Sequence, residues 1–482
     1  MSSSLEKIDS NKDSWGALFQ GGNALRSLTL VGGVVLYAIN MYIVTTILPN
    51  IVNDIGGLTY FSWNTTFFIV SSIVGSAVTS KVMGYYGPRK TYLLALFIFA
   101  CGSIWCALAF SMWFLLIGRA LQGVGGGMLF ALGYMLIRIV FEPRLWTRAT
   151  ALVSGMWGVA TLLGPAIGGI FAQSGNWRWA FWSLLPFIIV LGCVVLNKIA
   201  AKVDFDNESE SKLPNMTLIL LVLSVTLISL SSMKEDLIWM LSCLFLGLLL
   251  LGVMVSIDRK ATYKLLPTGA YSLKAVLGKT YLVMALLIFG MTTEIFVPYF
   301  LQVIHGLQPL GAGYLTAIMA AGWTIAAIPS AAQIGRIRRL LMMAGPICIS
   351  FSLMILASTL SIHSEGHFLL LSLYALALLG VGFGIGLVWP HLLNLVFISA
   401  PKGEEALTSA SVITVQLYAT ALAAAISGLV VNQAGIVSIG GLLGAQNASN
   451  YLFMIFSIAP IMAIFLVYKI VKLPAFHTIT VK

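Results

Sequence analysis

The sequence predicts an all-α, polytopic membrane protein, and two observations carry this prediction. Of the 482 residues, 59% are hydrophobic and only 9% are charged, a balance too apolar for a soluble globular protein of this size. Long apolar runs recur along the chain, and at roughly 20 residues per span they supply about a dozen or more transmembrane helices. The lipid bilayer is therefore the first partner that we expect.

The basic residues indicate how these helices are oriented. The chain carries 27 Lys and Arg and a formal net charge of +11. We place Arg178 and Lys234 on one side of the membrane, Arg119 inside a span, and the other 24 basic residues on the opposite side. This asymmetry follows the positive-inside rule and predicts that both termini are cytoplasmic. It also argues against nucleic acid as a partner, because the charge gathers in loops that flank the membrane.

The first half of the chain supplies six spans. Residues 1–26 form a polar tail, and the apolar run after it is too long for a cleaved signal peptide. We expect spans at about 28–51 and 58–83, two more divided near residue 111, and two divided near 174–178, which gives a bundle over 27–199. The five cysteines (Cys101, Cys106, Cys193, Cys243, Cys348) fall in apolar runs, so we expect buried thiols and not disulfides.

A charged cytoplasmic linker is expected at 200–214, where four acidic residues follow one another closely. Two further apolar runs over 215–257 are joined by a tight charged turn at 234–236, and a basic cytoplasmic loop follows at 258–279. A second set of six spans is expected over 280–470, with a short cytoplasmic tail at 471–482.

Three motifs of the first half resemble the major facilitator superfamily. They read Arg119-x-x-Gln122-Gly123-x-Gly125, Gly164-Pro165-x-x-Gly168-Gly169 and Trp177-Arg178-Trp179. Their order and spacing are similar to the fourteen-span drug/proton antiporter branch, and the Gly-Pro motif is the one associated with exporters. The segment with Gly84, Gly87, Arg89 and Lys90 is similar to the superfamily's cytoplasmic loop between helices two and three, which the family locks against neighbouring helices. With Gly164, Pro165, Gly168 and Gly169 they are the candidate conformational motif.

The resemblance implies about fourteen transmembrane helices, arranged as two pseudo-symmetric six-helix bundles plus an extra helix pair. The repeat can be tested by placing Ala149 over Ala406, which sets Gly164-Pro165 over Ala421-Leu422. Small residues persist in this register while the proline does not. Two related halves imply a solute site between them near the membrane midplane and transport by alternating access.

Two positions depart from the family pattern. Asn40 stands where the first helix of the family carries an acid, and Gly84 stands where the loop carries Asp. In the family the arginine of span four works with the missing acid. Arg119 is therefore expected to pair with Glu294, to receive an anionic group of the solute, or to be neutralised by water. The alternative to a functional role is a structural one, in which Arg119 anchors span four through hydrogen bonds.

Charged side chains inside the membrane are the first candidates for function, because placing each one there costs at least about 2.5 kcal/mol of free energy unless it is paired or hydrated. Arg119 and Glu294 are the two that lie well inside expected spans. His391 could relay protons, since imidazole titrates near neutral pH, or could be a satisfied packing group. These three are the candidates for proton coupling, with Glu294 as the preferred coupling site.

Polar and aromatic side chains of the expected inner helices are candidates for the solute cavity. They are Asn40, Tyr37, Trp63, Gln122, Trp157, Gln302, Trp323, Trp389, Asn394 and Gln416. Aromatic side chains that face inward suit a bulky, partly apolar solute. The sequence has no phosphate-binding Gly loop, zinc-spaced Cys and His or catalytic triad, so we expect no enzyme activity, cofactor or metal.

The sequence therefore predicts a secondary transporter of the plasma membrane, in a bacterium the inner membrane. It would export a small organic, partly apolar solute by alternating access, coupled to protons, in the manner of multidrug efflux, and would act as a monomer. Two alternatives stay open. One is an exporter of a single metabolite or siderophore-like anion, and the other is an uncoupled, transporter-like sensor or lipid-handling protein.

Overall fold

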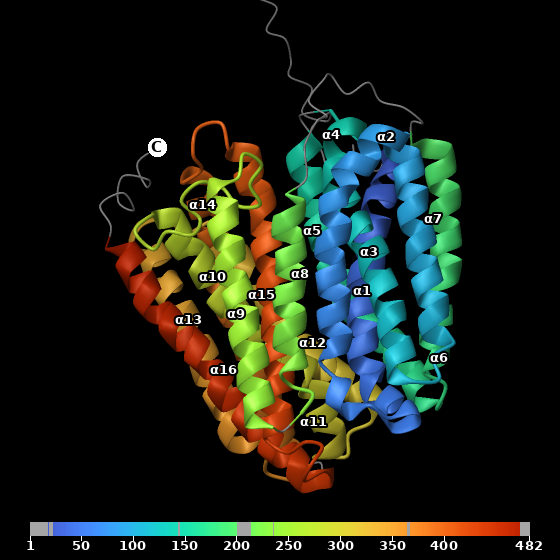
Figure 1. Ribbon diagram of the computed structural model, residues 1–482, viewed down its shortest axis with the longest axis vertical. Coiled ribbons are helices and arrows are strands. Elements are labelled where there is room, and N and C mark those ends of the chain that lie inside the picture. The colour runs from blue at the N-terminus through green and yellow to red at the C-terminus, as the bar shows by residue number, and fades with distance from the viewer. Residues whose placement is uncertain are drawn as a thin grey trace, which may run out of the picture.

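The computed structural model describes residue 18 and residues 23–142, 145–199, 214–234, 236–363 and 367–472. Within these ranges every regular element is a helix, as predicted, and the long helices run side by side (Figure 1). Apart from Pro214, the linker expected at 200–214 lies outside the described residues, and so does most of both expected tails.

The first group of helices covers the first six expected spans. It contains α1 (Asn23–Ile55), the short η2 (Leu58–Tyr60), α2 (Trp63–Ala107), α3 (Met112–Met135), α4 (Ile137–Val140), α5 (Trp146–Gln173), α6 (Arg178–Trp182) and α7 (Leu184–Lys198). The backbone of α2 is not helical at Gly87, where φ is 76° and ψ is 167°. A positive φ favours glycine, so the chain kinks there and turns back at the expected loop.

The inserted pair follows, with α8 (Asn215–Leu230) and α9 (Leu237–Lys260) packed against each other. The second group then contains α10 (Val276–Thr292), η4 (Thr293–Ile295), α11 (Val297–Val303), α12 (Pro309–Ala331), α13 (Gly335–Thr359), α14 (Phe368–Ile398), α15 (Glu405–Gln433) and α16 (Gly441–Val471). The span expected at the start of this group is thus broken into α10, η4 and α11.

Among the described residues, twelve helical segments are long and apolar enough to cross a membrane, judged by length and composition. The segment Leu58–Ala107 counts as one of the twelve although it contains the kink at Gly87, and α8 is apolar but shorter than the others. The prediction of an all-helical polytopic membrane protein is confirmed, whereas the count of fourteen spans is not.

The two groups meet along α5 with α12 and α2 with α15, and α8 packs against both α2 and α15. In Figure 1 the first group lies to the right and the second to the left. We call the end of the bundle at which α1 begins and α16 ends the upper end, and the end that carries the turns at Gly57, Gly306 and Gly440 the lower end.

Candidate functional site

The Gly-Pro motif of α5 lies between the two groups of helices. A Cβ at Gly164 would lie 2.3 Å from the Cβ of Tyr42 on α1, so this face of α5 accepts no larger residue. On the other face a Cβ at Gly169 would lie 2.6 Å from the Cα of Leu310, and a Cβ at Gly313 would lie 3.0 Å from the Cβ of Pro165. Small residues therefore let α5 approach α1 and α12 closely, as expected where helices pack inside a membrane.

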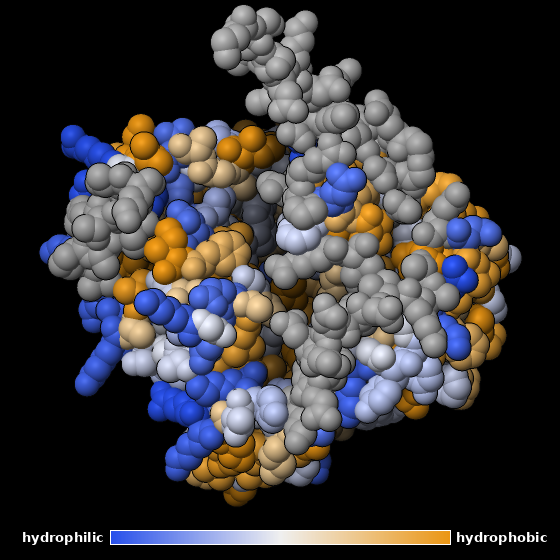
Figure 2. Space-filling view, turned by 90° about the horizontal axis from the view of Figure 1, so that it is seen from above, coloured by the Kyte–Doolittle hydropathy of each residue, from blue (hydrophilic) through white to orange (hydrophobic). Residues whose placement is uncertain are grey.

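This close contact does not continue along the upper half of α5. A Cβ at Gly155 or Gly158 would meet no atom within 4 Å. Seen from above, the surface is recessed between the two groups (Figure 2). The groups are thus in contact in their lower halves and part towards the upper end.

A cavity of about 30 Å³ is lined by residues from both groups, among them Tyr42, which also touches Gly164. The lining residues are Met41, Tyr42 and Thr45 of α1, Trp157 of α5, Glu294 of η4 and Thr316 of α12. Of the expected cavity residues, the structure places Trp157 in this lining, and it also places the coupling candidate Glu294 there. Tyr42 lines the cavity as well, whereas the sequence had not marked Met41, Thr45 or Thr316 as cavity residues.

Glu294 lies where the long helix is broken. Thr293–Ile295 form a 3-10 turn, and Pro298 stands in the first turn of α11. The carboxylate is half-buried, and it makes no hydrogen bond or ion pair with the part of the chain that the structure describes. An acid in an otherwise weakly polar cavity is available to bind a proton or a cation.

Arg119 is fully buried inside the first group and does not reach the cavity. Its Nη1 donates to Oε1 of Gln122 at 2.8 Å and its Nε donates to the carbonyl of Asn64 at 3.3 Å. Its guanidinium carbon lies 4.2 Å from the centre of the Phe68 ring. Gln122 in turn donates to Oγ of Ser103 at 2.9 Å. Arg119 and Gln122 thus anchor α3 to α2, and the ion pair with Glu294 is not formed in this structure.

A row of aromatic rings runs from this anchor to the cavity. The ring of Phe68 stacks on Tyr37 with centroids 5.2 Å apart, and Tyr37 meets Trp157 edge-on at 6.1 Å. Asn40, one turn along α1 from Tyr37, is fully buried, and its two amide atoms have no hydrogen-bond partner among the described residues. The expected residues Tyr37 and Asn40 therefore lie behind the cavity wall.

The remaining cavity candidates lie elsewhere. Trp63 is at the lower end, where its Nε1 donates to Oγ of Ser232 at 3.3 Å. Trp323 and Trp389 pack on each other within the second group at 5.3 Å. Asn394 is exposed, and Gln302 in α11 and Gln416 in α15 are half-buried. None of these six lines the cavity.

His391 lies near the upper end of the second group, away from Glu294. It is buried, and its Nε2 lies 3.0 Å from Oγ of Ser330, which itself donates to the carbonyl of Leu387 at 2.6 Å. This is the geometry of a satisfied packing group. In the expected conformational loop Arg89 donates to the carbonyl of Ile199 at 2.7 Å, while Gly84 and Lys90 are exposed.

Two polar clusters at the lower end were missed by sequence reasoning. Arg178 donates to Asp54 at 2.7 Å and to the carbonyl of Ala109 at 2.8 Å, and Trp177 donates to Asp54 at 3.1 Å. The motif Trp177-Arg178 therefore clamps α1 and the α2–α3 turn to α6. A signal was present, since Asp54 is an acid at the end of the first apolar run.

The second missed cluster joins the two groups. Nδ2 of Asn432 at the end of α15 donates to the carbonyl of Thr59 at 2.9 Å and to that of Ser232 at 3.0 Å. Phe61 stacks on Phe296 nearby with centroids 4.9 Å apart. The side-chain amide of Asn432 thus joins the second group to both the first group and the inserted pair. No sequence motif predicts this contact.

Comparisons with known proteins agree with this architecture. The family model of the Major Facilitator Superfamily matches residues 30–424. A protein of Mycobacterium tuberculosis described as a "probable multidrug-efflux transporter" is 35% identical over 444 residues, which are 91% of this chain and 93% of the relative. The multidrug transporter protein MdtP of Bacillus subtilis is 27% identical over 409 residues, covering 81% of this chain and 73% of the relative.

Solved structures share the fold. The crystal structure of a bacterial homologue of the human lysosomal transporter Spinster superposes with a TM-score of 0.65 at 13% identity and covers 96% of this chain and 99% of that one. The crystal structure of a D-xylose-proton symporter superposes with a TM-score of 0.65 at 14% identity, covering 93% of this chain and 98% of that one. At these identities the likeness concerns the fold alone.

Proposed function

Because the chain belongs to the Major Facilitator Superfamily, we propose that it exports a small organic, partly apolar solute from the cytoplasm by alternating access. The observation that carries this proposal is the cavity that both groups line, with the free carboxylate of Glu294 in its wall. The lower halves of the groups are in contact beneath it and the upper halves part above it. The names of the relatives, multidrug-efflux and multidrug transporters, support export of drug-like solutes.

We further propose fourteen spans. The kink at Gly87 divides α2 into two helices that each have the length of a crossing, and α8 adds another apolar helix. The units are then 27–199, 215–257 and 280–470, joined by the linker 200–214 and the loop 258–279. The upper end is cytoplasmic by the positive-inside rule, both termini lie there, and the protein works as a monomer in the plasma membrane, in a bacterium the inner membrane.

Coupling follows from competition at Glu294. A lone carboxylate between Tyr42 and Trp157 can be neutralised by a proton or by a cationic group of the solute, and not by both at once. Exchange of one for the other gives antiport. Because one proton replaces one cationic group, the exchange moves no net charge and the pH difference drives it. One pH unit supplies about 1.4 kcal/mol, enough for a solute gradient of about tenfold.

The geometry favours this reading over an anion exporter. The cavity presents a carboxylate, while the guanidinium of Arg119 is engaged by Gln122, Asn64 and Phe68. An uncoupled sensor is motivated by Asn40 and Gly84 alone. It would bind solute without exchanging it across a membrane, and this difference can be measured.

The test uses purified protein in proteoliposomes with a fluorescent cationic drug as the probe. Glu294→Gln should abolish accumulation driven by a pH gradient while drug exchange at equal pH survives. Glu405→Gln, which changes an exposed acid at the start of α15, is the matched control and should transport like the wild type. Full pH-driven accumulation by Glu294→Gln would refute the coupling role, and binding without exchange by the wild type would favour the sensor.

A further inference from the structure

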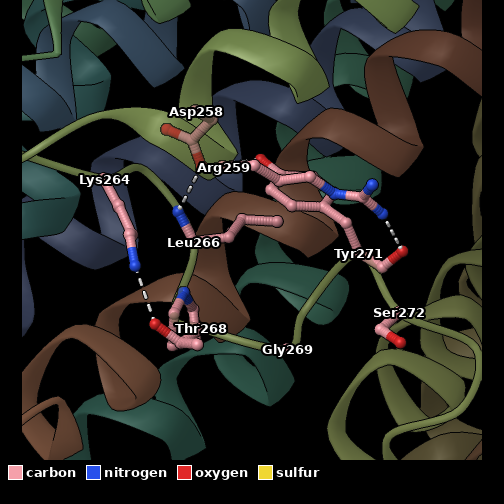
Figure 3. Close-up of a pocket in the computed structure, with 9 residues that line it drawn as sticks. Asp258, Arg259, Lys264, Leu266, Thr268, Gly269, Tyr271 and Ser272 are labelled. Carbon is pink, nitrogen blue, oxygen red and sulfur yellow. Dashed lines mark hydrogen bonds between the residues drawn. The ribbon is translucent and has the colours of Figure 1, made fainter.

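A second cavity, of about 340 Å³, lies outside the space between the two groups, in the connection between α9 and α10 (Figure 3). Its volume falls in the range of small-ligand pockets. It is lined by Asp258, Arg259, Lys264, Leu266, Pro267, Thr268, Gly269, Tyr271 and Ser272. The proposed transport function makes no use of this pocket.

Asp258 shapes the pocket through hydrogen bonds that occupy its carboxylate oxygens. Its buried carboxylate accepts hydrogen bonds from the backbone N–H of Leu265 at 2.7 Å and of Leu266 at 3.2 Å, and from the hydroxyl of Tyr271 at 2.8 Å. These bonds fold the connection back on the end of α9. The negative charge is thus directed at the loop and not at the cavity.

The other acid nearby is also engaged. Glu404, which precedes α15, accepts from the backbone N–H of Thr268 at 2.6 Å and from its hydroxyl at 2.7 Å. These bonds hold the pKa of Glu404 below its usual range, so the group is ionised. They fix the loop to α15, and Lys264 lies 3.7 Å from the same carboxylate.

Two cationic side chains on the wall keep unused donors. Arg259 gives one N–H to the carbonyl of Tyr271 at 2.6 Å, and Lys264 gives one to Oγ1 of Thr268 at 2.7 Å. A guanidinium has five N–H donors, so Arg259 keeps four for a ligand, while Lys264, whose ammonium has three and also pairs with Glu404, keeps one. Gly269, with φ of +91°, puts no side chain into the pocket. This set of donors suits the oxygens of a phosphate group.

The surroundings of the pocket are apolar. Leu249 and Val253 are exposed on α9 below it, and Tyr263 and Leu273 are 46% and 58% exposed in the loop beside it. Because α9 is an apolar helix of which little is buried inside the protein, Leu249 and Val253 face lipid. An acyl chain could follow them while a headgroup enters the pocket.

We propose that this pocket binds the phosphate-bearing headgroup of an anionic phospholipid of the cytoplasmic leaflet, with the phosphate at Arg259 and Lys264. The assignment to that leaflet rests on the proposed topology. Basic pockets at this level of a membrane protein are suited to anionic headgroups, and the exposed apolar side chains favour a lipid over a soluble phosphate compound.

The test measures the thermal stability of the full chain in a neutral detergent, with three additives in parallel. Phosphatidylglycerol should raise Tm, whereas phosphatidylcholine and soluble glycerol phosphate should not. Native mass spectrometry of the same samples should show phosphatidylglycerol retained on the protein. An equal rise with glycerol phosphate would overturn the lipid assignment, and an equal rise with phosphatidylcholine would overturn the anionic headgroup.

The variants locate the site. R259Q/K264Q should lose the phosphatidylglycerol shift, with at least about tenfold weaker retention, while the control K260Q/K274Q removes the same charge from the same loop outside the pocket and should keep it. Equal losses in the two variants would reduce the effect to loop charge and overturn the proposal. Should R259Q/K264Q not fold, R259Q alone carries the test, because this side chain is exposed.

Discussion

Replacing Asn432 by leucine tests whether the hydrogen bonds that join the two groups of helices at the lower end hold the transporter closed on that side. The change removes an amide that donates to Thr59 at 2.9 Å and to Ser232 at 3.0 Å. Each bond contributes about 0.5–1.5 kcal/mol net, so loss of both amounts to about 1–3 kcal/mol. If both bonds break when the lower end opens, the variant shifts the equilibrium about 5- to 150-fold towards the open form.

The assay is a distance measurement between spin labels at Asn176 and Ser438, which are exposed on the lower ends of the first and second groups. In a cysteine-free background, Asn432→Leu should increase the population with a long separation. The matched control is Gln433→Leu, since this neighbouring amide makes an exposed bond to the carbonyl of Lys234 at 3.3 Å. A folded Asn432→Leu protein with the distance distribution of the wild type would refute the reasoning.

Three further predictions concern motif, topology and pH. Pro165→Leu should leave the protein folded but slow transport, because a leucine must fit against Gly313; unchanged transport rates would reduce the motif to packing. Single cysteines at Lys234 and Arg259 should be labelled from opposite sides, outside and cytoplasmic, and labelling from one side would contradict fourteen spans. Glu404→Gln should lower Tm near neutral pH. Because the pKa of Glu404 is lowered in the folded protein, its stabilisation is present above the ordinary glutamate pKa, and the Tm difference should vanish as the pH falls through the lowered value.

The helices could be predicted from the sequence because apolar length reports directly on membrane thickness. The run at about 28–51 was expected as a span and lies within α1. The glycines Gly164 and Gly168 stood out in the sequence as part of one short motif, but their neighbours could not be named from it. The structure adds that α1 is the neighbour on this face.

The side-chain partners could not be predicted in the same way. An intramembrane residue can face lipid, a neighbouring helix or the cavity, and the rotation of each helix is set by packing across the whole bundle. Trp63 was expected at the cavity, yet it begins α2 and therefore lies at the lower end beside Ser232. Arg119 was expected to need a counter-ion, but carbonyl oxygens and the Phe68 ring engage its guanidinium.

The position of Glu294 lies between these cases. Its charge alone marked it as a candidate. In a continuous helix the direction of its side chain would depend on how the helix is rotated in the bundle. Pro298 changes this, because a proline has no N–H to donate to the carbonyl four residues earlier, and that carbonyl belongs to Glu294. The helix is broken at this residue, with a 3-10 turn over Thr293–Ile295. The same proline that interrupts the helix thus sets the acid at a discontinuity, the kind of site at which transporters of this architecture hold ions and solutes.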